Sequence, residues 1–196
     1  MANTYTQLYV HIVFAVSGRQ SLIHPSPNDE LQKYITGIVT NKGHKMFAIN
    51  NMPDHLHIFL SMKPTESISD LVRDIKANSS RLIREKKWSR FLFSWQEGYG
   101  AFTYAKSQKD MLVRYVMGQQ EHHRAKSFRE EYVEMLEKFD IPYDERYLFD
   151  FIDHEEVMKI LYAAPCMLFS ITCLYCCDVK NHNDRSVAGI REPVRP

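Results

Sequence analysis

Cysteine is absent from the first 165 of the 196 residues. All four cysteines, Cys166, Cys173, Cys176 and Cys177, lie close together near the end of the chain. A small secreted fold held by disulfides needs cysteines spread along the sequence, so that class is excluded. The spacing of Cys173 and Cys176 fits half of a zinc site, with His182 available as a further ligand. No second matching pair follows, which favours a reduced, partly buried cluster.

The chain also has no excess of charge of either sign, because its 25 Lys and Arg residues are balanced by 24 Asp and Glu residues. Any binding of nucleic acid must therefore come from local basic patches. The start of the chain has neither the charged nor the apolar region of a signal peptide, so we expect a cytoplasmic protein. A Gly-rich phosphate loop of the Walker type does not occur, and neither do internal repeats. These absences argue against a nucleotide-driven enzyme and against a repeat protein.

One uncharged run, Ile160 to Cys177, has 18 residues and reaches the lower limit for a membrane span. Pro165, Ser170 and Thr172 weaken that reading, and no second span is found. We therefore expect an appended packing or interface segment and no membrane partner.

The hydrophobic pattern before this run predicts a single α+β domain. Period-two and period-3.6 patterns indicate a strand–helix–strand–strand–helix–strand order followed by further helices. The predicted strands are 5–16, 45–52, 55–62, 91–95 and 99–104, and the predicted helices are 28–41, one starting at Ser67, 108–126 and 128–139. This order is typical of the ferredoxin-like, split βαβ or RRM-like fold, an antiparallel sheet with helices on one face and extra C-terminal helices. We assign residues 1–150 to this domain and 151–196 to a C-terminal extension of unknown role.

The segment 52–60, Met-Pro-Asp-His-Leu-His-Ile-Phe-Leu, is the organising motif. Pro53 and Asp54 indicate a turn that leads into a strand. Side chains alternate along a strand, so His55 and His57 point to one face and Leu56 to the other. We expect the two histidines on an accessible face, where they form half of a metal site; a polar strand face without metal is the alternative. His11, in the first strand, could face the same site.

A second set of candidate residues lies about sixty positions downstream. Tyr115 and Gln119 are four residues apart in a predicted helix and share one of its faces. A tyrosine beside a metal is a competent nucleophile toward a phosphodiester, and an amide oxygen could complete the coordination of a hard cation. Without the histidines, a core or interface tyrosine would be the better interpretation.

Three segments together resemble the single-tyrosine HUH transposases of small insertion sequences, TnpA-type enzymes that act on single-stranded DNA. They are Pro-Asp-His-Leu-His at 53–57, Trp-Gln-Glu-Gly-Tyr-Gly-Ala-Phe at 95–102 and Tyr-Val-Met-Gly-Gln at 115–119. The resemblance covers roughly residues 4–140. It implies a catalytic Tyr115, metal ligands at His55, His57 and Gln119, and a divalent cation, Mg²⁺ or Mn²⁺. It also implies a homodimer with shared active sites that recognises DNA hairpins and cleaves through a 5′-phosphotyrosine intermediate.

Contact with DNA is predicted for the basic face of the helix that starts at Ser67. The residues are Arg73, Lys76, Arg81, Arg84, Lys87 and the neighbouring Trp88, with His122, His123, Arg124 and Lys126 as a second basic patch. A solvated helix face is the alternative. Two other functions stay open at this point: a non-catalytic RRM-like nucleic-acid-binding module, and an HUH replication-type nickase or phosphodiesterase that uses the same site residues.

Overall fold

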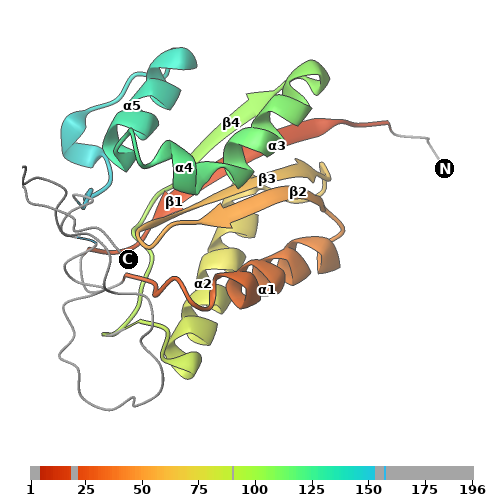
Figure 1. Ribbon diagram of the computed structural model, residues 1–196. Helices are drawn as coiled ribbons and strands as arrows, with labels where there is room; N and C mark the ends of the chain where they lie inside the picture. Colours follow the sequence, from red (N-terminus) through yellow and green to blue (C-terminus); the bar gives the residue numbers. More distant parts are fainter. Residues whose placement is uncertain (1–4, 19–21, 90, 153–156, 158–196) are drawn as a thin grey trace, which may run out of the picture. The chain divides into compact units, whose positions relative to one another are not determined.

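The computed structural model describes residues 5–18, 22–89, 91–152 and 157. The helices and strands follow the predicted order (Figure 1). The strands are β1 (Leu8–Ala15), β2 (Lys45–Asn51), β3 (His55–Met62) and β4 (Gly100–Tyr104). The helices are α1 (Asn28–Asn41), α2 (Ile68–Lys86), α3 (Lys109–Met117), α4 (Gln119–His122) and α5 (Phe128–Lys138), with short 3₁₀ turns at Lys106–Gln108 and Glu145–Tyr147.

The four strands form one antiparallel sheet in the order β2-β3-β1-β4. This order, with α1 and α2 as the two crossovers, is the split βαβ arrangement that the sequence predicts. In the register between β1 and β3, Val13 lies opposite His57 and His11 lies opposite Phe59. Directly paired residues share a face, so the histidines of both central strands point to the same side of the sheet.

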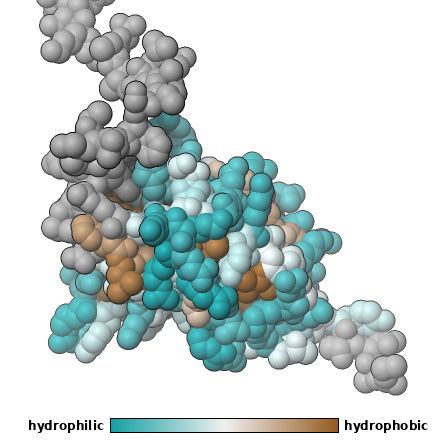
Figure 2. Space-filling view, turned by 90° about the horizontal axis from the view of Figure 1, so that it is seen from below, coloured by the Kyte–Doolittle hydropathy of each residue, from teal (hydrophilic) through white to brown (hydrophobic). Residues whose placement is uncertain are grey.

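The opposite face of the sheet packs on α1 and α2 (Figure 1). Helix α1 buries Leu31, Ile35 and Val39 at four-residue spacing, which is the stripe of an amphipathic helix. Helix α2 begins after Ser67, whose hydroxyl accepts a hydrogen bond from the amide of Asp70, as an N-cap does. Viewed from below, this side of the molecule presents mainly hydrophilic side chains (Figure 2).

The histidine-bearing face is covered by α3, α4 and α5 (Figure 1). Asn50 of β2 donates a side-chain hydrogen bond of 3.2 Å to the carbonyl of Met117 at the end of α3. Gly100 of β4 allows α5 to come close, because a Cβ there would lie 2.8 Å from the ring of Tyr132. The prediction of an accessible histidine face is therefore wrong, since the helices that follow β4 close over it.

Two predicted elements differ from those observed. The predicted strand 91–95 is reduced to a single bridge between Trp95 and Val16. Its first residues, Phe91 and Leu92, are exposed. The predicted helix 108–126 is divided at Gly118 into α3 and α4, so the glycine marks a break in the helix.

Almost all of the predicted extension 151–196, including the cysteine cluster and the uncharged run, lies outside the described residues. Within the part of the chain that the structure describes, no helix is long and apolar enough to cross a membrane.

Candidate active site

Strand β3 places His55 and His57 side by side on the covered face, as the alternation predicts. Their side chains are 1% and 0% exposed, and Leu56 is buried on the other face against the core of α1 and α2. The His55 ring stacks on Phe128 of α5, with ring centroids 3.9 Å apart and planes at 2°. The histidine pair is therefore a buried site between the sheet and α5.

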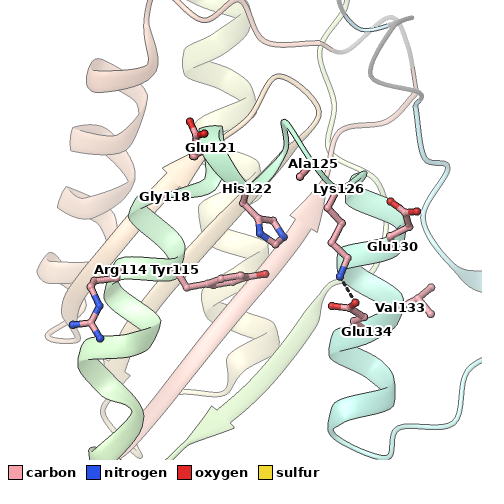
Figure 3. Close-up of a pocket in the computed structure, with 10 residues that line it drawn as sticks. All are labelled: Arg114, Tyr115, Gly118, Glu121, His122, Ala125, Lys126, Glu130, Val133 and Glu134. Atoms are coloured by element: carbon pink, nitrogen blue, oxygen red, sulfur yellow. Dashed lines mark ion pairs between the residues drawn. The ribbon is translucent and has the colours of Figure 1, made fainter.

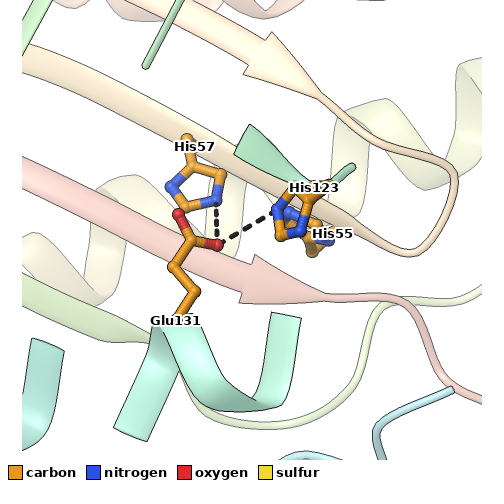
Figure 4. Close-up of side chains that lie close together, drawn as sticks. All are labelled: His55, His57, His123 and Glu131. Carbon is orange, nitrogen blue, oxygen red and sulfur yellow. Dashed lines mark ion pairs between the residues drawn. The ribbon is translucent and has the colours of Figure 1, made fainter. Parts of the chain in front are cut away.

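Three imidazoles meet at this site, because His123, just after α4, joins the pair (Figure 4). Each ring has its Nδ1 atom engaged by a neighbour. His55 Nδ1 lies 2.8 Å from an oxygen of Asp54, His57 Nδ1 lies 3.0 Å from His11 Nε2, and His123 Nδ1 lies 2.9 Å from the carbonyl of Lys126. These contacts fix the ring orientations and leave all three Nε2 atoms facing the interior of the site.

The carboxylate of Glu131, in the first turn of α5, lies at the centre of this group (Figure 4). One of its oxygens is 3.1 Å from His123 Nε2 and 3.5 Å from His57 Nε2. Burial alone would raise the pKa of the Glu131 carboxyl, but attraction to His57 and the close contact with His123 hold this pKa well below its usual range. Burial lowers the pKa of His57, whereas for His123 the contact with Glu131 outweighs burial and raises the pKa.

Tyr115 and Gln119 reach the same carboxylate from α3 and α4. The Tyr115 hydroxyl donates a hydrogen bond to Glu131, and Gln119 Nε2 donates one of 2.8 Å to the same oxygen. The Tyr115 ring meets the His57 ring edge to face, with centroids 6.2 Å apart. Burial, followed by the negative charge of Glu131, raises the pKa of the Tyr115 hydroxyl far above its ordinary value. The structure thus brings together the tyrosine, the glutamine and both histidines predicted from two distant segments.

The donor set of this site fits a metal ion. The Nε2 atoms of His55, His57 and His123, Gln119 Oε1 and the second oxygen of Glu131 are buried without a hydrogen-bond partner among the described residues. Buried polar atoms are rarely left unpaired. The ligand atoms of the three histidines and Glu131 all lie within 4.8 Å of one another. Such convergence of imidazole nitrogens and a carboxylate is typical of a metal centre.

A pocket of about 860 Å³ opens beside Tyr115, between α3, α4 and α5 (Figure 3). Its wall includes the ring of Tyr115, the ring of His122 and the ion pair between Lys126 and Glu134. His122 Nε2 lies 3.7 Å from Glu131, so this ring stands between the pocket and the buried site. The pocket gives an extended ligand a route to the tyrosine side of the histidine cluster.

Two residues of the site were not predicted. Glu131 occupies a core-facing position of α5, in a stripe with Phe128, Tyr132 and Met135, and a charged residue in an apolar stripe was the signal that could have revealed it. His123 was predicted in an exposed basic patch, but it is buried at the site. The other patch residues pair locally, Arg124 with Glu121 and Lys126 with Glu134.

The predicted DNA-binding residues lie on α2 or just after it, and α2 packs on the opposite face of the sheet from Tyr115. Arg73 pairs with Asp70 and Asp74, Arg84 donates to the carbonyl of Ser80, and Trp88 packs against the core. Lys76 donates to the carbonyls of Gln96 and Gly98, and burial lowers its pKa to about 8. The structure does not bring these residues to the histidine site, and Lys76 and Trp88 have structural contacts of their own.

The fold and the site define a class: an α+β protein with a tyrosine beside a buried histidine and carboxylate cluster on one face of its sheet. Residues 4–120, more than half of the chain, match the family described as "Transposase IS200 like", and the chain belongs to this family. Its members are transposases, which cleave and transfer DNA strands with a tyrosine. A non-catalytic RRM-like module is therefore no longer an alternative.

The chain is also similar to individual known proteins. The ISDra2 transposase TnpA of Deinococcus radiodurans is 27% identical over 120 residues, which cover 58% of this chain and 84% of the relative. A solved structure of a Deinococcus radiodurans R1 protein assigned as a transposase covers 61% of this chain and 95% of its own, with a TM-score of 0.47 and 22% identity. The structure of a REP-associated tyrosine transposase bound to a REP hairpin covers 63% and 73%, with a TM-score of 0.47 and 15% identity.

Proposed function

We propose that this transposase cleaves and rejoins single-stranded DNA through a covalent link to Tyr115, at a metal site that includes His55 and His57. One observation carries the proposal: the hydroxyl of Tyr115, the amide of Gln119 and the ring of His57 all contact the Glu131 carboxylate. A nucleophile, potential ligands and a pocket of about 860 Å³ therefore adjoin one another.

In the proposed reaction, the oxygen of Tyr115 attacks the scissile phosphorus. The hydroxyl proton is lost, the bond from phosphorus to the 3′ oxygen breaks, and that oxygen takes up a proton. The products are a 5′-phosphotyrosine and a free 3′-hydroxyl. The phosphotyrosine bond conserves the energy of the phosphodiester, so rejoining needs no nucleotide cofactor, which agrees with the lack of a Walker loop.

A divalent metal, Mg²⁺ or Mn²⁺ by the resemblance, would draw negative charge away from the phosphate when bound. His55, His57 and the Oε1 atom of Gln119 are the ligands that the resemblance implies. Asp54 and His11 hold the two histidine rings with Nε2 inward. Helix α3 orients Tyr115 by burying Leu112 and Val116 in a cluster on the sheet against which Tyr115 also packs.

DNA hairpins as substrates and a homodimer with shared active sites are proposals that rest on the sequence resemblance. A dimer suits the chemistry, because one tyrosine holds one DNA end at a time whereas excision handles two. Residues 1–150 would form the catalytic domain. The basic face of α2 would contact a part of the DNA remote from Tyr115, with Arg73, Arg81, Arg84 and Lys87 as its exposed cations.

A denaturing gel tests the proposal. The protein is incubated with labelled single-stranded DNA that carries a hairpin, with Mg²⁺ or Mn²⁺ and with chelator as control. We expect a slower-migrating covalent adduct that is absent with chelator. Cleavage that leaves no adduct would instead indicate a phosphodiesterase that uses water.

A further inference from the structure

Four donor groups converge on one buried point, and two of them lie outside the ligand set discussed above. His123 and Glu131 follow Tyr115 in the chain, whereas His55 and His57 precede it by about sixty residues. All four side chains are buried, and their ligand atoms lie within 4.8 Å of one another. In a tetrahedral site with bonds of about 2.1 Å, ligand atoms are separated by roughly 3.4 Å, so this spread approaches one coordination sphere.

The orientation of each donor is fixed from outside the cluster. Asp54, His11 and the carbonyl of Lys126 engage the three Nδ1 atoms, and each Nε2 atom is left without a hydrogen-bond partner among the described residues. Outer-shell contacts of this kind hold metal-bound histidines in one orientation. Glu131 has one oxygen engaged by Tyr115 and Gln119, while its second oxygen lies among the Nε2 atoms. Each donor therefore offers one oriented atom to the centre.

The chemistry of this donor set selects the kind of ion. Mg²⁺ prefers oxygen ligands and retains several waters, which three imidazoles and one carboxylate do not accommodate. Imidazole suits Zn²⁺ and the later divalent ions, and four protein ligands in a closed arrangement are typical of zinc sites without an open position.

We infer that His123 and Glu131 join His55 and His57 in a closed, four-ligand site for a zinc-class divalent ion, the resting form of the active site. This inference rests on the proposed function in one respect, that the same two histidines serve the cleavage reaction. In the resting form, Glu131 also accepts the hydrogen bond of Tyr115, so the nucleophile is held on a ligand of the ion. A DNA phosphate reaches the ion only when His123 or Glu131 gives up its position.

Zinc binding to the metal-free full-length protein, in the absence of DNA, tests the inference by calorimetry. We expect one tightly bound Zn²⁺ per chain and no comparable binding of Mg²⁺. His123→Ala and Glu131→Gln should each weaken Zn²⁺ binding tenfold or more, about 1.4 kcal/mol. The matched controls are His24→Ala, an exposed histidine, and Glu134→Gln, one turn further along the exposed side of α5. Both controls should change the affinity less than threefold.

Absorption of the Co²⁺-loaded protein gives a second measurement. Four-coordinate cobalt absorbs visible light strongly and six-coordinate cobalt weakly, so the wild type should give the strong spectrum and His123→Ala should lose it. Circular dichroism checks the folding of each variant. Glu131→Gln, which keeps the shape of the side chain, decides the matter if His123→Ala does not fold.

Wild-type affinity for Zn²⁺ in both His123→Ala and Glu131→Gln would overturn the inference, as would a weak cobalt spectrum of the wild type. None of these measurements requires cleavage. A protein that binds zinc as expected but forms no DNA adduct would refute the proposed function and leave this site intact. A protein that forms the DNA adduct, and whose affinity for Zn²⁺ is unchanged by His123→Ala and Glu131→Gln, would refute this inference and leave the proposed function intact.

Discussion

Glu131 is the single residue on which the site depends, because it contacts side chains from four segments. It accepts hydrogen bonds from Tyr115 and Gln119, and it lies within 3.5 Å of His57 and His123. A carboxylate 2% exposed is stable only when such partners compensate its lost hydration. The same contacts keep the Tyr115 hydroxyl protonated, since burial and the adjacent negative charge both raise its pKa.

Tyr115→Phe should abolish the covalent DNA adduct while leaving hairpin binding close to that of the wild type. The ring still packs against His57 and His11, but the nucleophilic oxygen is lost. The measurement is the denaturing gel, paired with a binding titration, and Tyr99→Phe is the control. An adduct in the Tyr115→Phe protein would show that another tyrosine is the nucleophile, with Tyr104 the next to be changed.

Leu56→Ala should lower the free energy of unfolding by roughly 2–5 kcal/mol, because Leu56 is fully buried and its truncation leaves a cavity. Leu92→Ala is the matched control, since Leu92 is 77% exposed and its loss should change the stability by about 0.5 kcal/mol or less. Urea unfolding followed by circular dichroism measures both. Equal losses would contradict the assigned faces of β3.

Lys76 gives a pH-dependent prediction. Its folded pKa of about 8 lies below the ordinary value of 10.5, so between these pH values the unfolded chain binds more protons and stability rises with pH. Lys76→Met removes the group and should remove that part of the rise, about 1 kcal/mol after a discount for partial exposure. The measurement is the free energy of unfolding of wild type and Lys76→Met at pH 7.5 and pH 10, and the two increases with pH are compared. An identical rise in wild type and variant would show that Lys76 titrates normally.

At the scale of single elements, the sequence specified best those elements whose local signals agree. Strand β3 has the predicted bounds 55–62, because a turn at Pro53 and Asp54 precedes an uninterrupted run of apolar and β-forming residues. Helix α2 begins where Ser67 caps it. The prediction of one helix over 108–126 was wrong at Gly118. Glycine costs only about 1 kcal/mol inside a helix, so the local sequence does not decide whether the helix breaks there.

Local signals in the sequence predicted only some of the residues of the site. His55, His57, Tyr115 and Gln119 lie in two short motifs with regular spacing. His123 directly follows α4, and Glu131 lies in α5, so both come after the helix break at Gly118. Their approach to the histidine pair depends on how α4 and α5 pack on the sheet. The apolar stripe of α5 indicates that Glu131 faces the interior, but the sequence does not indicate which side chains it meets there.

The packing of α5 on the sheet can be tested at Gly100. A Cβ at this position would lie 2.8 Å from the Tyr132 ring, so Gly100→Ala should force α5 away and cost about 1–3 kcal/mol. Gly37→Ala, in α1 with no atom near the added methyl, should stabilise the protein by about 0.5–1 kcal/mol. Denaturant unfolding compares the two. If Gly100→Ala and Gly37→Ala changed the free energy of unfolding in the same way, α5 would not pack against β4 at Gly100.

At the scale of the whole molecule, Tyr115 can act either at the histidines of its own chain or at those of a partner chain. Within one chain its hydroxyl already contacts Glu131 beside His57, which supports a self-contained resting site. The dimer proposed here places the working tyrosine of one chain at the histidines of the other. These arrangements predict opposite activities for a mixed dimer in which one chain lacks the tyrosine and the other lacks a histidine.

Mixing Tyr115→Phe with His57→Ala chains separates the two arrangements. If sites are shared between chains, the heterodimer regains one site with both an intact tyrosine and an intact histidine pair, so adduct formation should return to roughly half of the wild-type amount per dimer, although each parent is inactive. The adduct should form only on the chain that carries His57→Ala, which a size tag on that chain reveals. Heterodimers verified by their tags that still give no adduct would contradict sharing and assign catalysis to the arrangement within a single chain.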